Sequence, residues 1–298
     1  MNQSATSFHS GFVTIVGRPN VGKSSLMNAI IGEKIAIVSN RPQTTRSRIM
    51  GVLSQQDYQI VFLDTPGIHD PRTRLGEYMK HTVDEAMEGT DTVLMILDVS
   101  HITAKDLQIA EELLSGQVPV VLALNKIDLV SPEAVLAATA KAAEIGYDEI
   151  IPVSAKTGDG LNVLIGSMKN KMPDGPRYFP DDMITDQPER ILCAEIIREK
   201  ALRYLRDEVP HGIGVEIIGI QALSDALTEI NATIYCERAA HKRIIIGKQG
   251  TMLRQIGSEA RQDIERLLDT HVNLKLWIKI RPDWRNNPSD LKTLGYDS

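Results

Sequence analysis

Short apolar runs and amphipathic stretches alternate along the first half of the chain. The runs have the length of buried strands, and the stretches between them repeat apolar residues every three or four positions, as helices do. We expect strands near residues 12–16, 49–55, 58–63, 92–97, 119–124 and 150–153, and helices near residues 23–31, 76–88, 104–115, 132–144 and 160–171. The short connection Gln55-Gln56-Asp57 predicts that the second and third strands form a hairpin. The alternation as a whole predicts a doubly wound, mostly parallel sheet covered by helices on both faces.

The pattern changes after residue 172. Residues 173–188 show no periodicity and contain four prolines and several aspartates, which is typical of a linker. Residues 189–298 predict a smaller α+β domain, with helices expected at 189–207 and 251–268 and strands at 214–220, 229–237 and 272–280. The chain therefore divides into an N-terminal domain over residues 1–172, this linker and a C-terminal domain over residues 189–298.

A phosphate-binding loop connects the first expected strand to the first helix. Residues 17–24 read Gly-Arg-Pro-Asn-Val-Gly-Lys-Ser, the P-loop pattern of nucleotide-binding proteins. Consecutive backbone N–H groups wrap the phosphates, and the helix N-terminus adds a favourable dipole. Lys23 reaches the β- and γ-phosphates, and the Ser24 hydroxyl is a Mg²⁺ ligand. The candidate phosphate-binding residues are Gly17, Asn20, Val21, Gly22, Lys23, Ser24 and Ser25.

A second motif, Asp64-Thr65-Pro66-Gly67, ends the third expected strand. Asp64 at this place holds Mg²⁺ through water. Gly67 offers a backbone N–H to the γ-phosphate, and hydrolysis would break this contact. We assign Mg²⁺ to Ser24, Thr45 and Asp64, and catalytic roles to Lys23, Thr45 and Gly67. Thr45 is the chosen switch threonine, and its neighbour Thr44 is the alternative.

Two further motifs select guanine over adenine. Residues 125–128, Asn-Lys-Ile-Asp, end the fifth expected strand, and residues 154–156, Ser-Ala-Lys, follow the sixth. Asp128 accepts two hydrogen bonds from guanine N1–H and its exocyclic amine, which adenine cannot donate. A backbone N–H of the Ser-Ala-Lys loop meets guanine O6. Open α/β sheets bind ligands at these carboxyl ends of strands, so the motifs predict one site for GTP and GDP. The candidate base-binding residues are Asn125, Lys126, Asp128, Ser154, Ala155 and Lys156.

The catalytic apparatus departs from that of Ras-like GTPases at two places. Ile68 occupies the position where those enzymes use a glutamine to orient water, so we expect slow intrinsic hydrolysis. His69 is either a substitute base or a solvated loop residue. Asn20 resembles the asparagine of cation-activated GTPases, which helps to hold K⁺ against the phosphates; the alternative is that it only caps the turn.

The C-terminal half contains a candidate RNA-binding loop, Gly247-Lys248-Gln249-Gly250. The loop follows a strand-like apolar triplet, residues 244–246, and opens a helix. Three basic residues near it, Lys242, Arg243 and Arg254, add positive charge. The order α-β-β-α-α-β resembles a type II KH domain, in which a GXXG loop between two helices grips the backbone of single-stranded RNA. Four basic residues of the first helix are either RNA contacts or a solvated face: Arg198, Lys200, Arg203 and Arg206.

Composition and charge bear on the cellular location of the protein more than on its function. The formal net charge is −6, so any nucleic-acid binding must rely on local patches. Two cysteines, Cys193 and Cys236, are too few for a disulfide framework or a zinc site. The N-terminal residues lack the pattern of a signal peptide, and no apolar run reaches the roughly 20 residues of a membrane span. We therefore expect a cytoplasmic protein whose membrane contact, if any, is peripheral, and nothing indicates a stable oligomer.

Joined to this RNA-binding module, the four GTP motifs resemble the Era family of bacterial GTPases over nearly the whole chain. Family-like details are residues 43–46, Gln-Thr-Thr-Arg, residues 195–200, Glu-Ile-Ile-Arg-Glu-Lys, and residues 294–296, Leu-Gly-Tyr. The resemblance implies GTP hydrolysis coupled to binding the 3′ end of small-subunit (16S) ribosomal RNA. It also implies a role as an assembly factor on the pre-30S particle, and association with the inner face of the membrane.

Two other classes of function fit part of these observations. A scaffold that binds RNA and uses nucleotide only for stability would not need complete phosphate, magnesium and base motifs. A GTPase of membrane or translation traffic would use the C-terminal domain to bind protein instead of RNA. An ATPase is disfavoured by Asp128.

Overall fold

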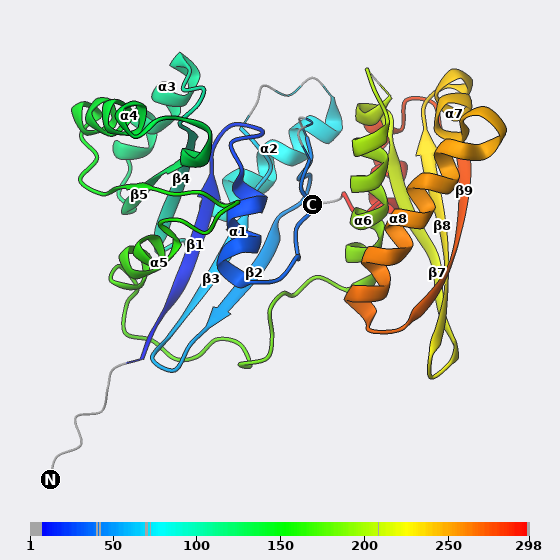
Figure 1. Cartoon of the computed structure of the whole chain (residues 1–298), viewed down its shortest axis with the longest axis horizontal. Helices are drawn as coiled ribbons and strands as arrows, with labels where there is room; N and C mark the ends of the chain where they lie inside the picture. The colour runs from blue at the N-terminus through cyan, green and yellow to red at the C-terminus, as the bar shows by residue number, and fades with distance from the viewer. Residues whose placement is uncertain are drawn as a thin grey trace, which may run out of the picture. The chain divides into compact units, whose positions relative to one another are not determined.

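The computed structural model describes residues 8–39, 41, 43–68, 71, 73–207 and 209–296 (Figure 1). The described residues fall into two compact units. The first unit takes those within Met1–Ala36, Thr45–His69 and Lys80–Asp186, and the second takes those within Ile37–Thr44, Asp70–Met79 and Gln187–Ser298.

The first unit is built on a six-stranded sheet in the order β2-β3-β1-β4-β5-β6. The strands are β1 (His9–Val16), β2 (Ile49–Ser54), β3 (Tyr58–Asp64), β4 (Thr92–Asp98), β5 (Val120–Asn125) and β6 (Ile150–Pro152). All neighbours are parallel except β2, which pairs with β3 as an antiparallel hairpin. The predicted mostly parallel sheet and its hairpin are therefore confirmed.

Helices cover both faces of this sheet. They are α1 (Lys23–Ile31), α2 (Arg74–Met87), α3 (Ala104–Leu114), α4 (Pro132–Ile145) and α5 (Leu161–Lys169), with the short 3₁₀ helix η1 (Ile127–Leu129) after β5. Leu26 of α1 and Leu164 of α5 belong to the core on one face, and Ile109 of α3 and Ala142 of α4 belong to the core on the other. Because β1, β3, β5 and β6 run in the same direction, the loops that follow them emerge at one edge of the sheet. These loops carry the four GTP motifs.

The second unit is an α+β fold with a three-stranded sheet in the order β7-β8-β9. Its elements are α6 (Glu189–Tyr204), η2 (Pro210–Gly212), β7 (Gly214–Ser224), β8 (Leu227–Cys236), α7 (Ala239–Ile246), η3 (Lys248–Gly250), α8 (Thr251–Leu268), β9 (His271–Ile280), η4 (Trp284–Asn286) and α9 (Pro288–Thr293). β7 and β8 are antiparallel, whereas β8 and β9 are parallel. In Figure 1, α6 and α8 lie side by side along this sheet. The predicted order α-β-β-α-α-β is confirmed.

One local expectation needs correction. The apolar triplet 244–246 is the last turn of α7, not a strand: the Gly247 N–H that follows donates to the Arg243 carbonyl (2.9 Å), as at the end of a helix. The segment predicted as a linker makes backbone hydrogen bonds with the first unit. The N–H of Ser10 donates to the Pro173 carbonyl (3.1 Å) and that of Val52 donates to the Ile184 carbonyl (2.9 Å), so this segment packs on the first unit.

Two segments that are distant in sequence complete the second unit. Residues 37–44 follow α1, and residues 70–79 contain the start of α2. Leu75 and Met79 of α2 are buried in a cluster with Trp284, Leu294 and Tyr296. Among the helices assigned to the described residues, none has the length and hydropathy of a transmembrane span.

Candidate nucleotide site and RNA interface

The phosphate loop is shaped by close backbone approach. Gly22 has φ 101°, in the left-handed region, and a Cβ there would lie 2.3 Å from Asn125 Nδ2. Lys23 is the first residue of α1, and its Nζ donates to the carbonyls of Gly17 (3.2 Å) and Arg18 (3.3 Å). The ammonium group therefore lies over the loop, at the positive end of the helix dipole, where phosphate oxygens would bind.

Three oxygen-bearing side chains meet beside this loop. Ser24 Oγ donates to Asp64 Oδ2 (2.6 Å), and Thr45 Oγ1 lies 2.9 Å from Ser24 Oγ and 3.3 Å from Asp64 Oδ2. Asp64 Oδ1 is buried and has no hydrogen-bond partner in the described part of the chain. A buried, unsatisfied carboxylate oxygen beside two hydroxyls is a donor set that suits Mg²⁺.

The alternative switch threonine has a different environment. Thr44 Oγ1 donates to the Arg41 carbonyl (2.6 Å) and lies 3.4 Å from the Ser39 carbonyl, both within its own segment. Its hydroxyl therefore closes a local turn, whereas the hydroxyl of Thr45 faces Ser24 and Asp64. The geometry favours Thr45 as the switch threonine.

Burial perturbs the two charges of this site in opposite directions. It lowers the pKa of Lys23 and raises the pKa of Asp64, and the charge of each residue partly offsets the shift of the other. Burial disfavours both ionised forms, so a phosphate beside Lys23 and a cation beside Asp64 would each restore them. The site is electrostatically suited to a metal–phosphate ligand.

Asn125 joins three of the motifs. Its Nδ2 donates to the Val21 carbonyl in the phosphate loop (2.9 Å), and its Oδ1 accepts from the backbone N–H of Ala155 (3.1 Å). The side chain is buried, and it holds the phosphate loop and the Ser-Ala-Lys loop in a fixed relation.

Lys126 and Asp128 complete the base-binding side. Lys126 Nζ donates to the Asn20 carbonyl (2.8 Å) and to Asp98 Oδ2 (2.6 Å). Asp128 Oδ1 accepts from Ser154 Oγ (2.8 Å), so the residue assigned to guanine is already oriented by the third loop. The Lys156 ammonium lies 4.0 Å from Asp128 Oδ2 and is largely exposed.

The Asp64–Gly67 turn packs against the phosphate loop. A Cβ on Gly67 would lie 2.7 Å from the Pro19 nitrogen, so the turn requires a glycine there. Thr65 Oγ1 donates to the Ile15 carbonyl (2.7 Å), which gives this residue a structural part. Pro66 is buried and Ser25 is half-buried. His69, the candidate base, lies outside the described residues.

Sequence reasoning missed two carboxylates beside the phosphate loop. Asp98, at the end of β4, accepts from Lys126, and Asp106 Oδ1 accepts from Arg18 Nε (2.7 Å). Asp106 also forms a capping box with Thr103 at the start of α3. The spacing Thr103-x-x-Asp106 was a detectable capping signal, but its contact with Arg18 depends on the tertiary fold.

The GXXG loop joins α7 to α8 and has a strained backbone. Gly247 has φ 72°, and a Cβ on it would lie 2.6 Å from Met252 Cβ. Gln249 also adopts a positive φ of 52°, and its side chain and that of Lys248 are exposed. The loop leads directly into α8, whose N-terminus presents backbone N–H groups beside it.

A groove of about 410 Å³ extends from this loop between α8 and β9. Its floor is apolar and its rim is basic. The lining residues are Gly250, Leu253, Arg254, Gly257, Ser258, Arg261, Leu274 and Leu276. Arg254 was predicted from its charge; the leucines were missed because only the fold reveals that they face the groove. Arg243 is exposed and Lys242 half-buried near the end of α7.

Two basic residues of α6 are neither RNA contacts nor part of a solvated face. Arg198 is fully buried, and Lys200 is 5 % exposed, with its Nζ 2.5 Å from Asp263 Oδ2. Both were open candidates on sequence alone. Arg203 and Arg206 are exposed.

Comparison with known proteins identifies the family. Residues 12–126 match the model of a 50S ribosome-binding GTPase, and residues 208–285 match that of a KH domain. GTPase Era of Ruminiclostridium cellulolyticum is 50 % identical over 292 residues, which cover 97 % of this chain and 98 % of that protein. GTPase Era of Alkaliphilus metalliredigens is 52 % identical over 294 residues, covering 98 % of this chain and all of that one.

This chain belongs to the Era family. It is a P-loop GTPase with a C-terminal KH domain.

Two solved Era structures share the fold. One is Era in complex with MgGDPNP and nucleotides 1506–1542 of 16S ribosomal RNA, and the other is a variant of Aquifex aeolicus Era bound to GDP.AlF4⁻. Each gives a TM-score of 0.93 at 39 % identity and covers 98 % of this chain and 100 % of that chain.

Proposed function

We propose that this chain couples GTP hydrolysis to binding of the 3′ end of 16S ribosomal RNA and assists assembly of the 30S subunit. The observation that carries the proposal is the full-length similarity to an Era structure that holds MgGDPNP and a 16S segment. The interlocked guanine site and the groove beside the GXXG loop support it in this chain's own residues. We propose the same division as before, a GTPase domain over residues 1–172, a connecting segment over 173–188 and a KH domain over 189–298.

The proposed roles follow from the contacts. Lys23 binds the β- and γ-phosphates, and Ser24, Thr45 and Asp64 hold Mg²⁺, which when bound neutralises charge on the phosphates. Gly67 donates its N–H to the γ-phosphate, and Asp128 reads guanine. Lys242, Arg243, Arg254 and the GXXG residues hold the RNA backbone. The contacts of Lys23, Mg²⁺ and the Gly67 N–H with the phosphates, and not those with RNA, stabilise the charge that develops as the phosphoryl group is transferred.

We propose that hydrolysis by the chain alone is slow. Ile68 is half-buried against the core beside α3, and its side chain cannot orient a water molecule. Asn20 is exposed in the phosphate loop and has a φ of 67°, and we propose that its side-chain oxygen helps to hold K⁺ there as a second cation. Residence in the cytoplasm, peripheral contact with the membrane and the absence of a stable oligomer stay predictions.

The decisive test measures GTP turnover with and without an oligonucleotide that copies the 3′ end of 16S ribosomal RNA. We expect stimulation that disappears in the Gly247→Asp/Gly250→Asp variant, because carboxylates in the loop repel the RNA phosphates. An oligonucleotide of scrambled sequence is the control for charge alone. Unchanged turnover together with no detectable binding would remove the ribosomal function and leave the GTPase.

A further inference from the structure

Arg198 is the most deeply buried cation of the second unit. It lies on α6, its side chain is 0 % exposed, and its Nε and Nη2 donate to the two carboxylate oxygens of Glu195 (2.7 and 2.5 Å). A buried guanidinium is tolerated only when its remaining donors also find acceptors. The acceptors of its other N–H groups therefore show which part of the chain Arg198 binds.

The remaining donors bind the backbone of residues 37–44, which belong to the same unit. Arg198 Nη1 donates to the Gln43 carbonyl (3.3 Å), and Nη2 donates to the Thr44 carbonyl. Gln43 has a φ of 60°, a left-handed conformation that costs a non-glycine residue about 1 kcal/mol or more. The arginine therefore captures two consecutive carbonyls at a strained point of the chain.

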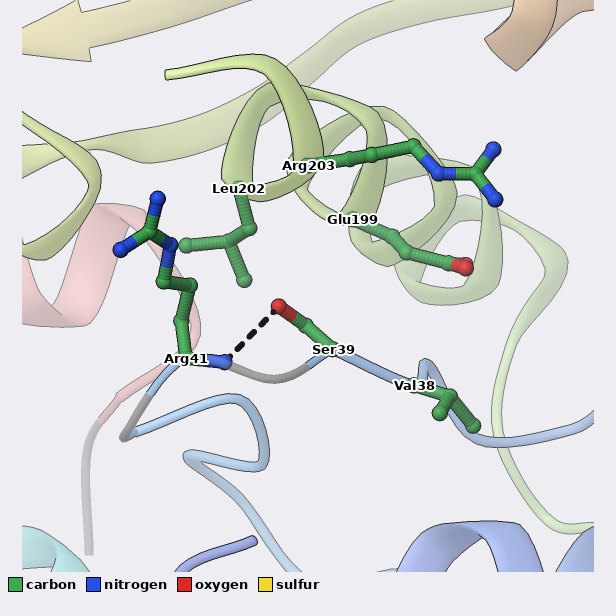
Figure 2. A pocket seen from close by; sticks show the side chains of 6 residues that line it. All are labelled: Val38, Ser39, Arg41, Glu199, Leu202 and Arg203. Carbon is green, nitrogen blue, oxygen red and sulfur yellow. Dashed lines mark hydrogen bonds between the residues drawn. The ribbon is translucent and has the colours of Figure 1, made fainter. Parts of the chain in front are cut away.

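A further hydrogen bond connects this segment to the chain just beyond α6. Arg41 Nη2 donates to the Leu205 carbonyl just beyond the helix (3.2 Å). Between the segment and the helix lies a cavity of about 440 Å³, lined by Val38, Ser39, Arg41, Glu199, Leu202 and Arg203 (Figure 2). Within it the Arg41 N–H donates to Ser39 Oγ (3.1 Å). Among the described residues, these polar contacts hold the segment beside the cavity.

We propose that Arg198 is a positioning residue for the GTP-bound state: by fixing the carbonyls of Gln43 and Thr44, it sets the backbone from which Thr45 reaches the metal site. Thr45 is the next residue, and its hydroxyl lies 2.9 Å from Ser24 Oγ. The inference rests on the proposed role of Thr45. Because switch threonines contact the cation and γ-phosphate only in the triphosphate state, Arg198 matters for GTP and not for GDP.

The test compares the Arg198→Lys full-length chain with the unchanged protein. Lysine keeps the charge but cannot bridge the Glu195 carboxylate and two carbonyls at once. Losing a hydrogen bond to a charged group should weaken GDPNP binding in Mg²⁺ about tenfold and lower kcat by a similar factor. Affinity for GDP should stay within about twofold, a difference that general destabilisation would not produce.

A control variant and a double-mutant cycle show whether the effect on GDPNP binding is specific to Arg198 and Thr45. Arg203→Lys changes an exposed arginine of the same helix, paired with Glu259, and should leave both affinities unchanged. Adding Arg198→Lys to Thr45→Ala should have no further effect on GDPNP binding, because the two residues act through one contact. Fully additive effects, or equal weakening of GDP and GDPNP, would overturn the inference.

Folding is checked separately. If Arg198→Lys does not melt cooperatively, the Glu195→Gln/Arg198→Gln double variant takes its place. It removes both charges of this ion pair, and the same selectivity is expected. If Thr45→Ala by itself leaves GDPNP binding unchanged, the assigned role of Thr45 fails and this inference fails with it. If Thr45→Ala selectively weakens GDPNP binding and Arg198→Lys does not, the inference about Arg198 is overturned while the role of Thr45 stands.

Discussion

The nucleotide site and the RNA interface of this chain are built on opposite principles. In the nucleotide site a core of polar side chains is buried and hydrogen-bonded within the site, as Asn125 is to the carbonyl of Val21 and the N–H of Ala155. At the GXXG loop, Lys248 and Gln249 are exposed at the end of a groove with an apolar floor. One site is a buried network of hydrogen bonds, and the other presents exposed polar side chains beside a groove.

The difference has an energetic meaning. Buried polar groups are desolvated during folding, so a substitution among them affects both stability and binding. Exposed lysines keep their hydration until RNA binds, so their contribution is electrostatic and depends on salt. Substitutions in the two regions should therefore produce different kinds of effect, and three experiments test whether they do.

The largest effect is expected from Asn125→Ala. The substitution leaves a buried carbonyl and a buried N–H without their partner, which costs about 2 kcal/mol or more. We expect GDP affinity to fall by roughly 30-fold or more and the melting temperature to fall by about 4–8 °C. Gln249→Ala in the RNA loop is the matched control, and it should leave the melting temperature unchanged. Equal melting temperatures for the two variants would remove the contrast between the sites.

A smaller effect is expected from Lys248→Gln. Losing one phosphate contact should reduce the slope of log K against log salt by about 0.7 for a single-stranded oligonucleotide, and weaken binding without altering GDP affinity. Lys141→Gln, an exposed lysine of α4, makes the same change of charge elsewhere. If both variants shift the slope alike, net charge and not the loop attracts the RNA.

The smallest effect concerns the cation at Asn20. We expect GTP hydrolysis to be a few-fold faster in KCl than in NaCl, and this difference to disappear in Asn20→Ala, because an oxygen ligand for K⁺ is lost. The control is Asn170→Ala, which changes an exposed asparagine at the end of α5. This variant should keep the difference between the rates in KCl and NaCl. Equal rates in the two salts for the unchanged protein would show that Asn20 only shapes the turn.

Local signals were enough to predict most of the elements. The helices at Lys23–Ile31 and Thr251–Leu268 have the predicted bounds, since glycines flank their starts and their apolar spacing is regular. The apolar triplet before the GXXG loop was misassigned because three consecutive isoleucines fit a strand and a helix end equally well. The prolines of residues 173–188 predicted irregular backbone, but they could not predict which residues the segment packs against.

For the functional residues, too, the sequence predicted some features and missed others. Motif order along the sequence determined that phosphate, metal and base residues meet at one edge of the sheet, because parallel strands bring their carboxyl ends together. Nothing in the local sequence around Arg198 indicated burial, and helical spacing allowed a solvated face.

What this sequence determined by itself is most of its secondary structure, its GTP motifs and the order of its KH module, all of which depend on residues close together in the chain. Only the tertiary structure decided that Arg198 is buried against the carbonyl of Thr44, 154 positions away, and that Asp98 holds Lys126. The physical reason is that desolvation and charge pairing depend on which distant groups meet, and short-range pattern contains no information about them.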